Sequence, residues 1–272
     1  MAETENRMPQ RVRHPLHFRR VKVISTEMLT PVLRRVVVGG DDLEGFYSPG
    51  FDDHMKFFPS VEGQALELPI LGEDGTPQWP DPKPAARDYT PRSFDAEKRL
   101  LTIDFAVGHG GPATAWAERA KVGDEAGIGG PRGSFIVPTG FAQHLLVGDE
   151  ASLPAISRRL EELPNGVKAV AVVEVEDASG EIELTSKADT EVIWVHRNGA
   201  PRGEGSALTA AALEAAKSID PSDAYVWVAC ESAVARALRP QLLEANAFNP
   251  KWMKVAAYWR QGAVGTHEVI ED

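Results

Sequence analysis

The chain has 272 residues, 43% of them hydrophobic and 25% charged, a composition typical of a globular protein with two modest domains. Its net charge of -11 argues against a general nucleic-acid binder and against an anchor on anionic lipid, but leaves room for a local basic pocket. The single cysteine, Cys230, cannot build a disulfide framework, a zinc knuckle or a thiolate-held iron–sulfur cluster. Redox chemistry would therefore need a bound organic cofactor or another metal.

The beginning of the chain predicts a cytoplasmic protein that does not enter a membrane. Residues 1–20 lack the apolar stretch of a secretory signal, and no segment approaches the length needed to cross a bilayer. Residues 1–15 are polar and contain two prolines, so we expect a mobile tail. We also expect a monomer.

The first half of the chain is rich in short β-branched runs separated by Gly and Pro clusters, the pattern of a small antiparallel barrel. A helix is expected over Ala113–Lys121, because Gly110-Gly111-Pro112 provides a typical helix entry. The expected strands are Val21–Ile24, Val32–Val38, Met55–Phe58, Ala65–Leu71, Tyr89–Phe94, Leu100–Val107 and Ala126–Ile128.

The second half alternates strands with helices, which indicates a doubly wound parallel sheet. With a boundary near Pro138–Gln143, we expect one domain over residues 16–140 and a second over residues 141–272. The expected strands are Leu145–Val147, Val167–Val175, Val192–Val195, Tyr225–Ala229 and Val255–Tyr258, and the expected helices are Leu153–Leu163, Ala207–Lys217 and Ser232–Ala245.

The string Arg87-Asp88-Tyr89-Thr90-Pro91-Arg92 combines groups that suit a flavin. An aromatic ring can stack on the isoalloxazine, a threonine can hydrogen-bond a ring nitrogen, and an arginine can meet a diphosphate. The alternative is an amphipathic strand that carries ordinary surface charges.

The string His109-Gly110-Gly111-Pro112-Ala113-Thr114-Ala115-Trp116 follows a strand and opens a helix. Free N–H groups at a helix start, together with small residues, make a suitable anion site. The alternative is a plain strand-to-helix turn. Because it follows the arginine–tyrosine strand closely, the two strings together favour a flavin site followed by a diphosphate site.

Two more strings lie in the second half. The segment from Leu146 to Ile156 is a strand, a turn and a helix, and its turn is the expected place for a nicotinamide diphosphate. It has no Gly-x-Gly-x-x-Gly fingerprint, which disfavours a standard Rossmann dehydrogenase; its acidic residues could also simply complement a helix dipole. The last string, Ala257 to Gly262, could pack at the flavin edge or merely end a strand.

In their order and spacing these strings resemble the siderophore-interacting protein family, ferric-siderophore reductases with a ferredoxin-reductase-like fold. The resemblance extends from about Arg19 to Gly262. The matching strings are Asp53-His54-Met55-Lys56, Arg87 to Arg92, His109 to Ala117, Gly123-Asp124, Gly130 to Phe135, Gly148 to Ile156 and Tyr258 to Gly262.

The resemblance implies a six-stranded antiparallel FAD-binding barrel followed by an NAD(P)H-binding α/β domain. The residues that it assigns to the cofactors are Arg87, Tyr89, Thr90, Arg92, Asp104, His109, Gly111, Ala113 and Thr114 for FAD, and Asp149, Glu150 and Ser152 for the nicotinamide half. It also implies that Lys56, Arg132 and Arg260 offer a basic surface to an anionic ferric chelate. Each of these three cations could instead be paired with a surface carboxylate, and for Lys56 the two alternatives weigh equally.

The chain departs from the family pattern in its second half. Ala229-Cys230-Glu231 stands where Ala-Gly-Glu is usual, Ala257 stands where a Gly is usual, and Ala151-Ser152 stands where Thr-Ala is usual. These departures bear on the choice of nicotinamide cofactor more than on the flavin site. Arg197 and Arg202 are candidates for reading the 2′-phosphate of NADPH, although both could serve the surface alone.

The expected function is the reduction of a ferric siderophore to release Fe(II), with electrons passing from NAD(P)H through FAD. No catalytic acid, nucleophile or protein-bound metal is expected, because the cofactor carries the chemistry. One alternative is a flavin reductase that serves a protein partner such as ferredoxin; another is a non-catalytic protein that binds ferric siderophores. Which siderophore, and which of NADH, NADPH or ferredoxin supplies electrons, stays open.

Overall fold

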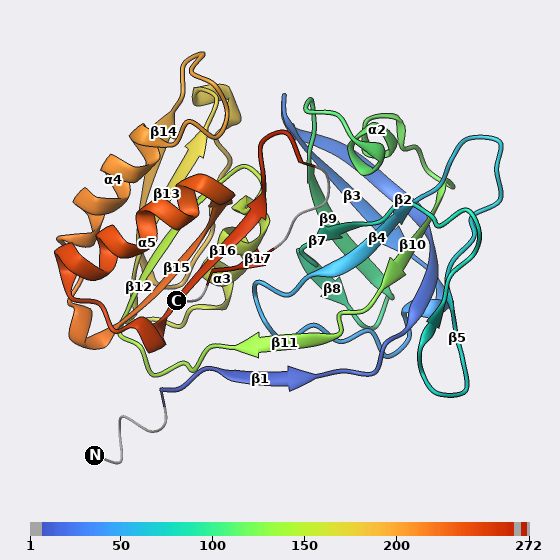
Figure 1. Ribbon diagram of the computed structural model, residues 1–272, viewed down its shortest axis with the longest axis horizontal. Helices are drawn as coiled ribbons and strands as arrows, with labels where there is room; N and C mark the ends of the chain where they lie inside the picture. The colour runs from blue at the N-terminus through green and yellow to red at the C-terminus, as the bar shows by residue number, and fades with distance from the viewer. Residues whose placement is uncertain (1–6, 264–267, 271–272) are drawn as a thin grey trace. The chain divides into compact units, whose positions relative to one another are not determined.

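The computed structural model describes residues 7–263 and 268–270 (Figure 1). The chain divides into two units, one formed by residues 11–136 and the other by residues 1–10 together with 137–272. In the described parts of the chain no helix is long and apolar enough to cross a membrane.

The unit of residues 11–136 contains a seven-stranded antiparallel sheet with the strand order β7-β4-β10-β2-β3-β9-β8. The strands are β2 (Phe18–Thr30), β3 (Leu33–Gly39), β4 (Met55–Pro59), β7 (Arg87–Tyr89), β8 (Ser93–Asp95), β9 (Leu100–Ala106) and β10 (Glu125–Gly129). Buried residues alternate with exposed ones along much of β2, as expected for a strand with one face on the core and one in solvent.

Strands β7 and β8 lie at opposite edges of the sheet order, yet only Thr90, Pro91 and Arg92 separate them. Four residue steps reach at most about 14 Å, so the sheet curls until its two edges approach each other and takes a barrel-like shape. All three seam residues are buried, and proline suits a position outside the hydrogen-bond ladder. The sequence predicts one strand over Tyr89–Phe94, which this seam divides into β7 and β8. The sheet has seven strands, whereas the family resemblance implies six.

Helix α2 (Pro112–Arg119) covers the barrel core with Ala113, Trp116 and Ala117. Phe57 and Phe105 pack against Trp116, with ring centroids 4.8 and 6.0 Å away. Aromatic burial on this scale accounts for a firm attachment of the helix to the sheet.

The second unit has a six-stranded sheet in the order β14-β13-β12-β15-β16-β17, parallel except for its last strand. Its strands are β12 (Gln143–Asp149), β13 (Lys168–Val175), β14 (Asp189–His196), β15 (Ala224–Glu231), β16 (Met253–Trp259) and β17 (Glu268–Val269). Its helices are α3 (Leu153–Glu162), α4 (Ser206–Ala216) and α5 (Ser232–Asn246). The strand order reverses between β12 and β15, and ligands of such sheets bind at the carboxyl ends of the strands beside this point.

The expectation of a mobile tail over residues 1–15 is wrong for its second part. Strand β1 (Gln10–Arg13) pairs with β11 (Gly133–Ile136), which the sequence does not predict as a strand. Arg7 forms a 3.0 Å ion pair with Asp223, and the His14 ring lies 2.8 Å from the Ser134 hydroxyl. These contacts are long-range, so local sequence patterns carry no sign of them.

The strand expected over Ala65–Leu71 is also largely wrong. Only β5 (Ile70–Leu71) is extended, and it pairs with β6 (Pro77–Gln78) in a separate two-stranded sheet. Both β5 residues are exposed, whereas Leu66, earlier in the expected strand, is buried.

Candidate functional site

Tyr89, at the end of β7, connects the string Arg87–Arg92 with the string His109–Trp116 through a hydrogen bond. Its hydroxyl is hydrogen-bonded with the side chain of Thr114, and the Thr114 hydroxyl lies 3.3 Å from Nδ1 of His109. Burial raises the pKa of Tyr89 to about 12, so the phenol stays protonated at neutral pH. Its ring packs 4.4 Å from that of Phe105. The structure thus brings Tyr89, His109 and Thr114 together at the barrel seam.

The loop before α2 is built from glycines in conformations that other residues avoid. Gly110 has φ 76°, and Gly111, which caps the helix, has φ 102° and ψ 157°. A methyl group added at either position would have nothing within 4 Å, so the loop faces open space. Pro112 has no N–H, and Ala113 and Thr114 stand in the first helical turn, where N–H groups have no partner within the helix. This arrangement suits a diphosphate.

Asp104 lies on β9 with a side chain only 1% exposed. Its two oxygens accept hydrogen bonds of 2.7 and 2.8 Å from Arg35, and its Oδ2 lies 3.8 Å from Nε of Arg92. Arg92 is the last residue of the seam and is 9% exposed. This geometry gives Asp104 a positioning role for Arg92 and leaves direct contact with a cofactor to the arginine.

The first strand of the flavin motif also carries Arg87 and leads into Thr90. Arg87 is half-buried and donates 2.7 Å to the Ala86 carbonyl, while Thr90 is 8% exposed. With Arg92, both lie at or beside the seam. The tyrosine, threonine and arginine groups, together with the open glycine loop, fit the ring and the phosphates of a flavin dinucleotide.

Two of the three predicted chelate-binding cations belong to the barrel unit. Lys56 on β4 is paired with Asp88 on β7, with 2.8 Å between Nζ and Oδ2. Arg132 is exposed and forms no ion pair among the described residues, while its carbonyl accepts from the His14 N–H at 2.9 Å. Arg260 follows β16 in the other unit and is also exposed. The structure does not place Arg260 relative to the other two.

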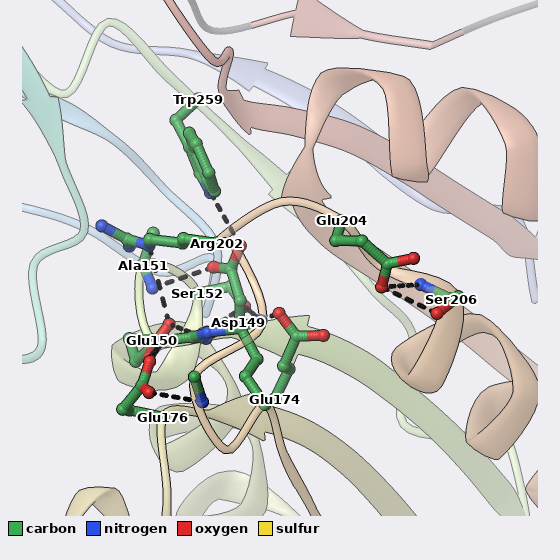
Figure 2. A network of polar contacts seen from close by, with 12 residues as sticks. Asp149, Glu150, Ala151, Ser152, Glu174, Glu176, Arg202, Glu204, Ser206 and Trp259 are labelled. Carbon is green, nitrogen blue, oxygen red and sulfur yellow. Dashed lines mark hydrogen bonds and ion pairs between the residues drawn. The ribbon is translucent and has the colours of Figure 1, made fainter.

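In the second unit, the polar groups of the turn after β12 form hydrogen bonds with one another (Figure 2). The Asp149 N–H donates to the Ser152 hydroxyl at 3.0 Å, and the Ala151 N–H donates to Asp149 Oδ1 at 2.9 Å. The Trp259 indole donates to Asp149 Oδ2 at 2.7 Å. Burial raises the pKa of Asp149. The backbone N–H groups of Asp149 and Ala151, which could otherwise donate to a phosphate at the start of α3, therefore already donate within the turn.

Glu150 anchors a second part of this network. Arg197 donates to both Glu150 oxygens, at 2.6 and 3.1 Å, and also reaches Glu174 at 3.4 Å and Glu176 at 3.2 Å. Burial raises the pKa of Glu174 to about 7, although the positive charge of Arg197 acts to lower it. With three carboxylates around it, Arg197 is a poor candidate for reading a phosphate.

Arg202 is the more accessible arginine of the pair. Its guanidinium lies 4.7 Å from the centroid of the Trp259 ring, its Nε is 3.7 Å from Glu150, and its side chain is 23% exposed. Glu231, at the end of β15, caps α5 and accepts from the Gln261 N–H at 3.1 Å. These contacts hold Trp259 and Arg202 at the edge where the strand order reverses.

Sequence reasoning missed Arg35, Glu174 and Glu231 as parts of the two sites. Arg35 stands in a β-branched run and meets Asp104 only through the register of β3 with β9. Glu174 had a usable signal, because a carboxylate within the otherwise apolar end of a parallel strand is unusual.

Comparison with known families matches both halves of the chain. Residues 22–135 match the siderophore-interacting FAD-binding domain, and residues 141–262 match the siderophore-interacting protein domain.

Individual relatives agree with these matches. The NADPH-dependent ferric-chelate reductase of Escherichia coli is 37% identical, over 93% of this chain and 97% of that protein. A siderophore utilization protein from T. fusca superposes with a TM-score of 0.85 and 36% identity, covering 95% of this chain and 98% of that one.

The ferredoxin reductase of carbazole 1,9a-dioxygenase shares the fold at a TM-score of 0.64 and 15% identity, over 88% of this chain and 67% of that one. The fold is therefore ferredoxin-reductase-like, with an antiparallel barrel followed by a parallel-sheet unit. Identity above 30% along nearly the full length, together with both domain matches, shows that the chain belongs to the siderophore-interacting protein family.

Proposed function

We propose that this protein is an FAD-dependent reductase that takes electrons from NAD(P)H and reduces iron(III) held by a siderophore. One hydride supplies two electrons, so two ferrous ions and one proton leave for each NAD(P)H oxidised. Iron(II) binds hard oxygen ligands less strongly than iron(III), so reduction loosens the chelate. Because NAD(P)H is a cytoplasmic nucleotide, the proposal places the reaction in the cytoplasm.

The observation that carries this proposal is the chain of contacts from Tyr89 through Thr114 to His109 at the barrel seam. It joins an aromatic ring and a hydroxyl to a glycine loop at the start of a helix. A flavin dinucleotide needs both features, since its ring stacks on a planar side chain and its diphosphate accepts hydrogen bonds from backbone N–H groups.

FAD, when bound, would supply the conversion of a two-electron donor to single-electron transfer. The protein would supply binding and charge. Thr90 and Tyr89 would meet the flavin ring, Arg87 and Arg92 its ribityl-phosphate arm, and the Gly111 loop with Ala113 and Thr114 its diphosphate. Asp104 would keep Arg92 oriented. A buried arginine paired with a carboxylate, as Arg92 is with Asp104, is more rigid than a surface arginine.

We propose that the nicotinamide donor binds where the strand order of the second unit reverses. Asp149, Glu150 and Ser152 would shape this edge through the network described above. Of the two arginines that follow β14, Arg202 is the better partner for a 2′-phosphate, because Arg197 already holds three carboxylates. Within the barrel unit, the chelate would meet Lys56 and Arg132.

The test is a steady-state assay with a ferric siderophore, NADPH or NADH, and a colorimetric trap for Fe(II). We expect two trapped ferrous ions for each donor oxidised, at a rate well above that of the same concentration of free FAD without protein. A rate equal to that of free FAD would contradict the proposal.

A protein electron donor such as ferredoxin is the second candidate. The specific observation in its favour is the self-bonded turn from Asp149 to Ser152, which uses donors that a dinucleotide diphosphate would otherwise take. This candidate would be favoured if the bound flavin is not reduced by NADPH or NADH, but is reduced by reduced ferredoxin and reoxidised by the chelate.

A further inference from the structure

Asp88 is the acidic residue inside the flavin motif, and it neutralises one of the cations proposed to meet the chelate. Lys56 and Asp88 are direct partners in the register of β4 with β7. Lys56 Nζ lies 2.8 Å from Asp88 Oδ2, and the two side chains are 50% and 18% exposed. The pair therefore stands at the surface, on the face opposite to the buried Met55 and Phe57.

The pair contributes little to folding. An ion pair of a half-exposed lysine generally contributes little to stability, because solvent screens it and the side chain loses conformational freedom. Asp88 Oδ1 is buried and accepts no hydrogen bond from the described residues, which is a cost. Stability alone gives no reason for a carboxylate at this position, whereas its charge has a direct effect on whatever approaches Lys56.

The surrounding charge makes this effect selective. Gly129 on β10 is the other register partner of Lys56, and the exposed Arg132 follows three residues later. With Asp88 present, Lys56 is neutralised, while Arg132 forms no ion pair among the described residues.

Ferric chelates differ strongly in net charge. Three hydroxamates neutralise iron(III), whereas three catecholates leave a complex with three negative charges. Removing one positive charge about a nanometre away weakens the attraction for a trianion by roughly three- to tenfold at low salt, and hardly changes binding of a neutral complex.

We propose that Asp88 is a charge filter at the chelate site, where by neutralising Lys56 it favours ferric chelates of low negative charge, such as trihydroxamates, over tricatecholates. This inference rests on the proposed function, because it takes from that function the role of Lys56 and Arg132.

The test is a binding titration on the FAD-loaded, oxidised protein, with quenching of tryptophan fluorescence as the readout. The two probes are the iron(III) complexes of a hexadentate trihydroxamate and of a hexadentate tricatecholate. Asp88→Asn should tighten binding of the tricatecholate about three- to tenfold at low salt and change the trihydroxamate by less than about twofold. The gain should vanish at about 0.5 M salt.

Asp95→Asn is the matched control, since Asp95 is an exposed carboxylate of the same barrel paired with Lys98 at 3.3 Å. It should leave both affinities unchanged. If Asp88→Asn fails to fold, the wild-type salt dependence decides, because a neutralised Lys56 predicts a shallow slope for the tricatecholate. Equal effects of Asp88→Asn on both chelates, or a steep wild-type slope, would overturn the inference.

The two proposals fail in different ways. Chelates that bind with the expected charge preference but never reoxidise chemically reduced flavin would remove the reductase function and leave the filter. Chelates that are reduced with no dependence on Asp88 would remove the filter and leave the function.

Discussion

At the scale of single residues, the most consequential contact in the barrel unit is the carboxylate of Asp104 shared between Arg35 and Arg92. The resemblance to the family places Asp104 among the cofactor ligands, but the geometry makes it a support for one of them. Its side chain is 1% exposed, so water could not take the place of the carboxylate as the partner of the two arginines.

We predict that Asp104→Asn lowers the free energy of unfolding by about 2 to 3 kcal/mol, because it leaves two guanidinium groups without their shared partner. FAD affinity should fall about tenfold as Arg92 loses its orientation. Urea unfolding of the flavin-free protein and a flavin titration measure the two effects. Glu125→Gln, which breaks the exposed pair with Arg20, should cost less than about 1 kcal/mol and leave FAD binding intact.

At the scale of elements, the start of α2 decides whether the barrel can receive a diphosphate. Gly111 adopts φ 102° and ψ 157°, a region that is almost confined to glycine. Its surroundings are open, so a side chain there would enter the space of the ligand and would not strike the protein.

We predict that Gly111→Ala costs about 1 to 3 kcal/mol of stability and weakens FAD binding at least about tenfold. Gly75→Ala is the control, because Gly75 also has a positive φ, 76°, and open surroundings, but lies in the turn between β5 and β6. It should lose stability without losing FAD affinity. Similar losses of affinity in both variants would indicate a general effect of strain on the barrel.

The sequence predicts most of these elements, since alternation and Gly–Pro punctuation locate the parallel sheet, its helices and most barrel strands. It fails where partners are distant. The strand β11 forms only because the N-terminal segment pairs with it, and the seam at Thr90–Arg92 divides one expected strand in two. The cofactor motifs are visible as strings, but the contact of Tyr89 with Thr114 follows from barrel closure, which no local pattern encodes.

At the scale of the whole molecule, a buried histidine links stability to pH. His144 on β12 is 1% exposed, and its Nδ1 has no hydrogen-bond partner among the described residues. Burial, with a further contribution from the charge of Arg159, lowers the pKa of His144 well below its ordinary value of 6.5. Below about pH 6.5 the unfolded chain therefore binds a proton that the folded chain rejects.

We predict that stability falls as the pH drops below about 6.5, with His144 contributing up to about 1.4 kcal/mol per pH unit until its folded pKa is reached. His144→Gln should flatten this part of the curve. The difference between the two proteins, measured by urea unfolding from pH 7 to pH 5, isolates the histidine. The raised pKa of Glu174, about 7, acts in the opposite direction and is common to both proteins. Parallel curves for variant and wild type would contradict the prediction.

The proposed function requires a flavin that is bound at the barrel seam, is reduced there and passes its electrons to a ferric chelate. The most direct measurement is the visible spectrum of the purified protein under anaerobic conditions, recorded before and after NADPH or NADH and again after a ferric siderophore. The account predicts flavin bands that bleach with the nicotinamide and return with the chelate, together with Fe(II) in the trap. A colourless protein that takes up no added FAD would contradict it.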